Sequence, residues 1–488
     1  MQDNKKIATT GFNNSSDTRV VYLDSDKDLI HSEIIKSGSR VITFEHTLIL
    51  SFLHENGFRN YREQLIRVID NVGSEVTKES IFKFLLSHVE SFDDNQLINA
   101  YYKQGESLIL KNNGLIHGIK DVEFEPLKDV VDIGYIAYLN GVVKVTKKDV
   151  IIIPYVDLKN FVWQNHIINR CFSLIECYED SPNVYNKCLR NSTNNEEHYK
   201  SIISAIGNLI HKYKDQRLTK AIIINDENLS EKDEQGGSGK GLIVKSVSKI
   251  RPTLIINGKN ADPSRNRFFL QGVTSTTCVI SIDDPPRNVI FDDYFSLLTD
   301  EMTVEKKHKG ALIIPYKESP KFAFTTNYTI KGSSSSHKRR RFDIFLNSFY
   351  NSDHTPSNDF HHEFFYDWDD NEWSKFDFFM SLCLQTFLKE GLIVYNNEEL
   401  ILKKLKNETS ADFFELMEVD YTSMTKYSLP DMRSKLINIY GDKYLFLNKE
   451  TSRLMEWVEK YSAYKGYVFS KGRASYGMWF SFSLKEKV

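Results

Sequence analysis

Residues 235–242 read Gln235-Gly236-Gly237-Ser238-Gly239-Lys240-Gly241-Leu242, and they lie between an apolar run of strand type (221–225) and a run of helical type (242–250). Glycines let backbone N–H groups turn towards phosphate oxygens, and a following helix presents its positive end to the same anion. The order of strand, glycine turn, lysine and helix therefore predicts a nucleotide phosphate loop. Gly236, Gly237, Ser238, Gly239, Lys240 and Gly241 would bind the phosphates, and Lys240 would reach the terminal ones.

This loop departs from the usual pattern in two places. Glu234 stands where the pattern has its first glycine, and Gly241 stands where a serine or threonine normally holds Mg²⁺. An acidic insert, residues 227–234, also separates the strand from the glycines. The alternative interpretation is an ordinary flexible loop.

A second apolar run, residues 278–282, ends in two carboxylates, Asp283 and Asp284, before two prolines. Buried parallel strands have continuous apolar sequences, and ligands collect at the carboxyl ends of such strands. Asp283 would hold Mg²⁺ and Asp284 would polarise the attacking water. An acidic turn before proline is the alternative, but the position after the glycine loop is the order that nucleotide hydrolysis requires.

A third run, residues 321–328, ends in a polar cluster that contains Asn327, which would orient water against the γ-phosphate or merely cap a turn. A basic cluster, residues 337–341, follows and leads directly into an alternating run, residues 342–346. The cluster fits a solvated face, a nucleic-acid contact or an arginine finger for the phosphate of a neighbouring subunit.

The order of these segments resembles that of the superfamily 3 helicases, which are AAA+ ring ATPases encoded by phages, plasmids, prophages and DNA viruses. The helicase module of phage-type primase-helicases is the most similar group, and there the loop often reads Gly-Gly-x-Gly-Lys-Gly, as at residues 236–241 here. The resemblance covers roughly residues 130–350. It implies an α/β fold with an AAA+ P-loop core, a mostly parallel sheet, and ATP with Mg²⁺ as cofactors.

The resemblance also implies a role for each motif residue. Lys240 and the glycine loop bind ATP, Asp283 is the metal carboxylate, Asp284 activates water and Asn327 senses the γ-phosphate. The residue that best matches the finger acting on a neighbouring subunit is Arg341, with Arg340 next. The family has a pore hairpin between the Asp-Asp strand and the Asn strand, and here that segment carries Lys306, Lys307, His308 and Lys309. Lysines at such a tip can bind successive backbone phosphates, although a solvated loop is the alternative.

Composition excludes several classes of protein. The chain has 488 residues, 41% of them hydrophobic and 26% charged, which is ordinary for a globular protein of two to four domains. Its net charge of -3 gives no overall basic field, so nucleic-acid contacts must come from local patches. The five cysteines form no Cys-x-x-Cys pair and match no standard zinc finger, and their odd number suits a reducing compartment. The sequence shows no signal peptide and no membrane span, so a cytoplasmic protein is expected.

Local patterns divide the chain into five predicted domains. Residues 1–130 form an N-terminal α+β domain, with helices at 48–53, 61–69 and 81–89 and a strand pair at 107–111 and 114–118; this suits a winged helix or a packing module. Residues 131–215 contain a hairpin around Asn140-Gly141 and helices at 158–177 and 199–213, and they resemble an oligomerisation collar. Residues 216–350 form the ATPase core, with strands at 221–224, 253–256, 278–282, 321–325 and 342–346.

The last two domains are a linker with a helical lid, residues 351–410 with a helix at 376–389, and a winged-helix-like DNA-binding domain, residues 411–488. The latter has predicted helices at 430–440 and 451–463 and wing strands at 467–470 and 477–482. Lys471 and Arg473 would lie at the wing tip and face phosphate, and a C-terminal lid without DNA contact is the alternative.

These expectations lead to an ATP-dependent DNA helicase or translocase for replication of a phage or mobile element. It would act as a homo-oligomer, a hexamer by resemblance, on single-stranded or forked DNA. The sequence has no acidic polymerase triad, so any primase would be a separate partner. Two alternatives stay open: a ring ATPase switch without unwinding, such as a replication initiator or phage-defence ATPase, and a DNA-binding scaffold whose loop is inactive.

Overall fold

The computed structural model describes residues 17–20, 30–36, 39–111, 114–227, 237–307, 310–328, 330, 334–396, 398–421, 425–475 and 477–483. The chain forms two compact units. The first comprises Met1–Lys128, Tyr135–Lys144 and Ile151–Phe172, and the second comprises Asp129–Gly134, Val145–Val150 and Ser173–Val488. None of the described helices is long and apolar enough to cross a membrane.

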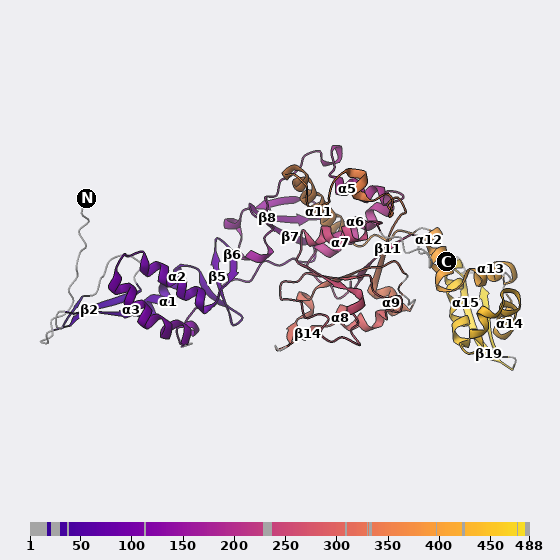
Figure 1. Ribbon diagram of the computed structural model, residues 1–488. Helices are drawn as coiled ribbons and strands as arrows, with labels where there is room; N and C mark the ends of the chain where they lie inside the picture. Colours follow the sequence, from indigo (N-terminus) through magenta and orange to yellow (C-terminus); the bar gives the residue numbers. More distant parts are fainter. Residues whose placement is uncertain are drawn as a thin grey trace. The chain divides into compact units, whose positions relative to one another are not determined.

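The first unit packs helices against two small sheets (Figure 1). The sheet orders are β1-β2-β3 and β10-β6-β5-β4. Its core lies between α1, α2 and α3 and includes Ile49, Phe52, Leu85 and Tyr101. The elements are β1 (Asp17–Val20), β2 (His31–Lys36), β3 (Ser39–Phe44), α1 (His46–Glu55), β4 (Phe58–Tyr61), β5 (Gln64–Ile69), β6 (Val72–Glu75), α2 (Lys78–Glu90), α3 (Asn95–Gly105), η1 (Glu106–Lys111), α4 (Gly114–His117), η2 (Tyr155–Asp157), β10 (Val162–Trp163) and η3 (Gln164–His166).

Three predictions for this region were wrong. Residues 61–69 are not a helix, because Arg62 and Glu63 adopt positive φ angles of 51° and 67° and turn β4 into β5. Residues 107–118 are not a strand pair: η1 is a π-helical continuation of α3, and α4 is a short helix beyond residues 112–113, which lie outside the described part. Residues 158–177 hold short turns and β10, not a helix. The predicted helices at 48–53 and 81–89 are confirmed by α1 and α2.

The hairpin predicted around Asn140-Gly141 is confirmed. Strand β7 (Ile133–Tyr138) precedes these residues, and β8 (Gly141–Thr146) follows with Gly141 at a φ of 144°. With β9 (Val150–Ile153) they form a sheet of order β7-β8-β9.

The second unit is built on a five-stranded parallel sheet in a mixed α/β arrangement. Its order is β12-β13-β16-β11-β17, and every neighbouring pair is parallel. All five predicted strands are confirmed: β11 (Ala221–Asp226), β12 (Thr253–Asn257), β13 (Val279–Asp283), β16 (Lys321–Thr325) and β17 (Arg341–Leu346). Strand β16 therefore lies between the strand before the glycine loop and the strand that ends in Asp283.

Helices and a hairpin cover the two faces of this sheet (Figure 1). On one face, Ile223, Ile282 and Phe324 pack against α8 and the hairpin β14–β15. On the other, α6 and α7 contact the sheet, and α11 packs on α6 so closely that a Cβ on Gly207 would lie 2.1 Å from the carbonyl oxygen of Cys383. The elements are η4 (Tyr178–Asp180), α5 (Val184–Asn191), α6 (Glu196–Ile210), α7 (Lys240–Ser248), η5 (Gly258–Asn260), η6 (Phe291–Tyr294), α8 (Phe295–Thr299), β14 (Met302–Val304), β15 (Leu312–Ile314), η7 (Tyr316–Glu318), α9 (Ser335–Arg340), α10 (Pro356–Phe360) and α11 (Asp370–Glu390). Helices α6 and α11 confirm the helices predicted at 199–213 and 376–389 in their main parts.

The C-terminal part of the second unit has a core of its own, which includes Phe413, Met432, Trp457 and Phe480. Its sheet order is β18-β20-β19, all antiparallel. The elements are α12 (Glu398–Glu408), α13 (Ala411–Asp420), β18 (Lys426–Ser428), α14 (Leu429–Tyr440), η8 (Asp442–Asn448), α15 (Thr451–Lys465), β19 (Val468–Ala474) and β20 (Gly477–Ser483). Both predicted helices are confirmed by α14 and α15.

Candidate functional site

The glycine loop enters α7 through two residues in left-handed backbone conformations. Gly237 has a φ of 99° and Gly239, which precedes the first residue of α7, has a φ of 93°, values that a residue with a Cβ adopts only with strain. A Cβ on Gly237 would also lie 2.7 Å from the carbonyl oxygen of Asn351. Gly236 lies outside the described residues. Gly237 and Gly239 therefore adopt backbone conformations that favour glycine, and the phosphate-binding role of the loop stays a prediction.

Gly241 is the position where the usual pattern has a hydroxyl side chain. A Cβ added to Gly241 would meet nothing within 4 Å. The space for a side chain is thus present, and packing does not require glycine here.

Lys240 is the first residue of α7, and its ammonium group is surrounded by oxygens (12% of the side chain is exposed). It donates to Oδ1 of Asn327 at 2.7 Å and to Oγ of Ser238 at 3.1 Å. It also forms an ion pair with Asp226. The structure therefore joins Lys240 to Asn327, two residues that the sequence interpretation placed in one site from separate motifs.

Asp226 is a site residue that the sequence interpretation missed. It is the last residue of β11, and its carboxylate is 14% exposed and contacts Lys240. The signal was present in the sequence, because the apolar run from Ala221 to Ile224 ends in the polar pair Asn225-Asp226. The predicted strand ends before Asp226, and the sequence pattern assigns this residue no role.

The paired carboxylates lie at the carboxyl ends of the same sheet. Asp283 is the last residue of β13 and pairs with Thr325 of β16, whose hydroxyl donates to Oδ1 of Asp283. Asp284 follows with a φ of 50°, and its N–H donates to the carbonyl oxygen of Thr325 at 3.0 Å. Both aspartates are exposed. This edge of the sheet therefore carries two accessible carboxylates whose backbone is fixed by β16.

Among the described residues, no three His, Cys, Asp or Glu side chains gather into a metal-binding group. Asp283 is nevertheless suited to Mg²⁺, because this ion is commonly held by one or two carboxylates together with substrate phosphates and water. The exposed Asp283 is oriented by Thr325, and among the described residues no hydrogen bond is made to its Oδ2, which can accept one from water or bind an ion. The residues present thus fit a metal held jointly with a nucleotide.

The basic cluster separates into a buried and an exposed part. Arg341 is only 7% exposed, donates from Nε and Nη2 to Asp343 at 2.9 Å each, and donates from Nη1 to the carbonyl oxygen of Ile330 at 2.7 Å. Arg340, at the end of α9, is partly exposed, with its guanidinium 4.4 Å from the centre of the Phe295 ring. Arg341 is thus held inside its own chain, and Arg340 is the better placed of the two for a neighbouring subunit.

The segment assigned to the pore hairpin does form a hairpin. Strands β14 and β15 pair in antiparallel fashion from Met302–Ile314 to Val304–Leu312. Lys306 is partly exposed and Lys307 is exposed in the connecting loop, while His308 and Lys309 lie outside the described residues. The hairpin places at least two lysines at its tip.

The predicted wing tip was wrong in its position. Lys471, Gly472 and Arg473 lie within β19, which continues to Ala474 and pairs with β20 along its whole length. Nζ of Lys471 is 3.2 Å from a carboxylate oxygen of Glu459 on α15. The turn is therefore later in sequence, because Gly472 pairs with Trp479 within the strand ladder and leaves room for its indole ring.

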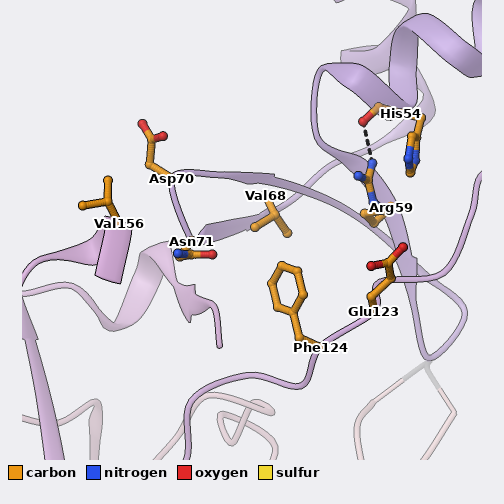
Figure 2. A pocket seen from close by; sticks show the side chains of 8 residues that line it. All are labelled: His54, Arg59, Val68, Asp70, Asn71, Glu123, Phe124 and Val156. Carbon is orange, nitrogen blue, oxygen red and sulfur yellow. Dashed lines mark hydrogen bonds between the residues drawn. The ribbon is translucent and has the colours of Figure 1, made fainter. Parts of the chain in front are cut away.

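A cavity of about 500 Å³ lies in the first unit and contains none of the predicted site residues (Figure 2). Phe124 and Val68 form its apolar part, and Arg59, Asp70 and Glu123 are its charged residues. The guanidinium of Arg59 donates to the carbonyl oxygen of His54 at 2.6 Å, as the dashed line shows. Burial lowers the pKa of Arg59, and the neighbouring Glu123 opposes this shift.

Comparison with known proteins gives remote structural similarity only. No family model and no curated protein matches the chain. The A form apo structure of the NrS-1 C terminal region is similar over 89% of this chain and 98% of that chain, with 12% sequence identity and a TM-score of 0.39. A JCV helicase structure with a bound acetamide compound is similar over 57% of this chain and 67% of that chain, with 12% identity and a TM-score of 0.20. At these values the similarities assign the chain to no family.

Proposed function

We propose that this protein is an ATP hydrolase that uses Mg²⁺, with its catalytic site at the carboxyl edge of the parallel sheet. The observation that carries the proposal is the hydrogen bond of 2.7 Å between Nζ of Lys240 and Oδ1 of Asn327. It brings the lysine of a glycine loop to the polar end of the adjacent strand, and on the next strand Asp283 and Asp284 are exposed. Lysine, carboxylates and a polar water-orienting residue are the groups that phosphoryl transfer requires.

Each residue has a distinct role in this proposal. Gly237, Ser238 and Gly239 present backbone N–H groups to the phosphates, and Lys240 neutralises the charge that develops on the terminal ones. Asp283 holds Mg²⁺, which neutralises phosphate charge when it is bound. Asp284 accepts a proton from the attacking water, and Asn327 orients that water.

We further propose that hydrolysis drives a ring-forming DNA helicase or translocase of the superfamily 3, AAA+ type, acting in replication of a phage or mobile element. Three features support it: the order of the motifs, the hairpin β14–β15 with Lys306 and Lys307 near its tip, and Arg340 on the surface of α9. The ring would contain six subunits with ATP between them, and the hairpins would grip one strand of DNA. The oligomerisation collar predicted at 131–215 stays a prediction, since most residues of α6 are buried within one chain.

The C-terminal part is proposed to be a winged helix that contacts DNA. The order helix, strand, helix, helix, strand, strand from α13 to β20, with the sheet order β18-β20-β19, supports this fold. Lys471 and Arg473 stay candidates for phosphate contacts. A lid without DNA contact is the alternative. If removal of the charges of Lys471 and Arg473 abolishes single-stranded DNA binding, the winged helix contacts DNA; if binding is unchanged, the lid is supported.

The test compares purified wild-type protein with Lys240→Ala and, as a matched control on the same helix, Lys245→Ala, whose side chain is exposed on α7. Lys240→Ala should abolish Mg²⁺-dependent ATP hydrolysis without altering the circular dichroism spectrum, and Lys245→Ala should retain it. Unchanged turnover in Lys240→Ala would refute the proposal. Hydrolysis without strand displacement on a forked substrate would indicate a ring ATPase switch, and absence of nucleotide binding would indicate a scaffold.

A further inference from the structure

The ammonium group of Lys240 already has a full set of hydrogen-bond acceptors. A lysine ammonium carries three hydrogens, and here three oxygens accept them, from Asp226, Ser238 and Asn327. A phosphate oxygen can therefore bind Lys240 only if one of these contacts is exchanged.

Of these three contacts, Asp226 is the one that carries the same sign of charge as a phosphate. Ser238 and Asn327 are neutral, whereas Asp226 is an anion, as is the phosphate that approaches the same cation. Because the side chains of Lys240 and Asp226 are only 12% and 14% exposed, charges here interact more strongly than they do in water. The carboxylate thus attracts the lysine and repels the incoming phosphate.

The neighbouring carboxylate shows that this arrangement is specific to Asp226. Glu227 follows it directly, but its Oε1 accepts a hydrogen bond of 2.7 Å from Nδ2 of Asn194 and lies 3.8 Å from Nδ1 of His198. Within the part of the chain that the structure describes, Oδ1 of Asp226 is buried and accepts no hydrogen bond. Among the described residues, Lys240 is therefore the only hydrogen-bond partner of the Asp226 carboxylate.

We propose that Asp226 is a built-in competitor of the nucleotide phosphates for Lys240, and that it sets the affinity of the site for ATP and ADP. The inference rests on the proposed function, because it concerns the same site. Asp226 is a positioning residue: without nucleotide it holds Lys240 at the loop, and on binding it gives the lysine up to the phosphates. It weakens the binding of ligands that carry phosphates and leaves the binding of a nucleoside without phosphates as it is.

The test measures dissociation constants by calorimetry for ATP, ADP and adenosine with Mg²⁺ in wild type and Asp226→Asn. The substitution keeps the size and an accepting oxygen but removes the charge. It should lower the dissociation constants of ATP and ADP about tenfold, the effect expected for one partly buried charge pair, and leave that of adenosine unchanged. Glu227→Gln, which removes the adjacent charge, should leave all three constants unchanged.

Stability supplies a second readout. Asp226→Asn should melt at a lower temperature than wild type without nucleotide, because the ion pair is lost, and should gain more from saturating ADP. If Asp226→Asn does not fold, Asp226→Ala serves in its place, because it also removes the charge, with a smaller side chain. Its dissociation constants for ATP and ADP should likewise be lower than those of wild type.

Unchanged or weaker ATP binding in both variants would overturn the proposal, and so would a parallel change in adenosine binding, which would indicate a distorted loop. If wild type and variants alike bind no nucleotide, the proposed function itself fails. If Asp226→Asn binds ATP or ADP under conditions in which wild type shows no binding, the result would support competition between Asp226 and the phosphates for Lys240.

Discussion

Gly258 lies directly against Pro285, so that a Cβ on the glycine would come within 2.4 Å of the proline backbone nitrogen and Cα. Gly258 follows β12, and Pro285 follows Asp284, whose φ of 50° is uncommon for a residue with a side chain. The glycine therefore makes room for the turn that presents the two carboxylates, and residues in such conformations persist only where their surroundings hold them.

We predict that Gly258→Ala displaces this turn. The rate of ATP hydrolysis should fall strongly, whereas the loss in free energy of unfolding should be too small to unfold the protein. The backbone must shift to admit the methyl group, which costs roughly 1–3 kcal/mol of the free energy of unfolding, as overpacking generally does. Turnover should fall at least tenfold while the protein stays folded at 25 °C. Steady-state kinetics and urea unfolding on the same preparation check both parts.

Gly310→Ala is the matched control, since a Cβ there would meet nothing within 4 Å. It should hydrolyse ATP at the wild-type rate. Equal losses in the two variants, or wild-type turnover in Gly258→Ala, would show that the contact with Pro285 does not position the carboxylates.

The environment of Arg341 leads to a second prediction. Its guanidinium is nearly inaccessible and is fixed by Asp343 and by the carbonyl oxygen of Ile330. Arg341→Ala removes the ion pair with Asp343 and the hydrogen bond to Ile330, and breaking a buried ion pair of this kind costs roughly 3 kcal/mol. We expect Arg341→Ala to lower the midpoint of urea unfolding, whatever other subunits are present.

Arg340→Ala should behave differently. Its side chain is partly exposed and is held by the ring of Phe295 rather than by a carboxylate. If it completes the site of a neighbouring subunit, Arg340→Ala subunits mixed into wild type should inhibit ATP hydrolysis more steeply than dilution does. If inhibition only matches dilution, Arg340 does not complete the site of a neighbouring subunit. If Arg341→Ala unfolds at the wild-type midpoint, its guanidinium is not needed for stability and Arg341 is again the candidate for that contact.

The five-stranded parallel sheet was the part of the fold that the sequence predicted best, for a physical reason. Its central strands β11, β13 and β16 are buried on both faces, so that runs such as Ala221–Ile224 are continuously apolar and end where polar residues begin. The resemblance placed Lys240 and Asn327 in one site, and the parallel strands bring their carboxyl ends to the same edge of the sheet. Asp226 was missed because its role depends on strand β11 extending two residues further, and strand ends are where sequence patterns are least informative.

The errors fell where tertiary context decides the conformation. Residues 61–69 carry apolar residues at a spacing that suits a helix, but the pair Arg62-Glu63 turns the chain with positive φ angles. Such turns are usually predicted from glycine or asparagine at these positions, and here neither is present. The segment at 106–111 continues α3 as a π-helical turn, a rare geometry without a sequence signature. In β19, the sequence pattern predicts a turn at Gly472, whereas the glycine leaves room for the indole of Trp479, which lies 2.6 Å from where a Cβ on the glycine would be.

A further prediction concerns the pH dependence of stability. Burial lowers the pKa of Lys321 to about 7, and the nearby Lys214 and Arg251 act in the same direction while Asp129 opposes them. In the unfolded chain this lysine titrates near its usual value of about 10.4. Between these two values the unfolded chain binds one more proton than the folded protein, so the free energy of unfolding rises as the pH rises from 7.

We expect wild type to gain roughly 1–2 kcal/mol relative to Lys321→Met between pH 7 and pH 9, as measured by urea unfolding. Methionine has a similar length and no charge, so the variant loses this part of the pH dependence, although the carbonyl oxygen of Asn208 loses the hydrogen bond that Nζ donates at 2.8 Å. Lys317→Met, at an exposed position of η7, should keep the wild-type slope. Parallel slopes for wild type and Lys321→Met would contradict a depressed pKa.

The hairpin lysines provide the last prediction. Lys306 and Lys307 follow β14, and Nζ of Lys307 is 5.9 Å from the centre of the Phe268 ring, so the charge stays near the surface. If they bind phosphates, Lys306→Ala and Lys307→Ala should each weaken single-stranded DNA binding to a similar degree for every sequence. Each should also reduce the dependence of log K on log[salt] by about 0.7–1, the contribution of one phosphate contact.

Lys317→Ala removes an exposed lysine beyond the other end of the hairpin and should leave this slope as it is in wild type. Fluorescence anisotropy at several salt concentrations measures all three variants, and a slope that is the same in every protein would exclude these lysines from the DNA contact.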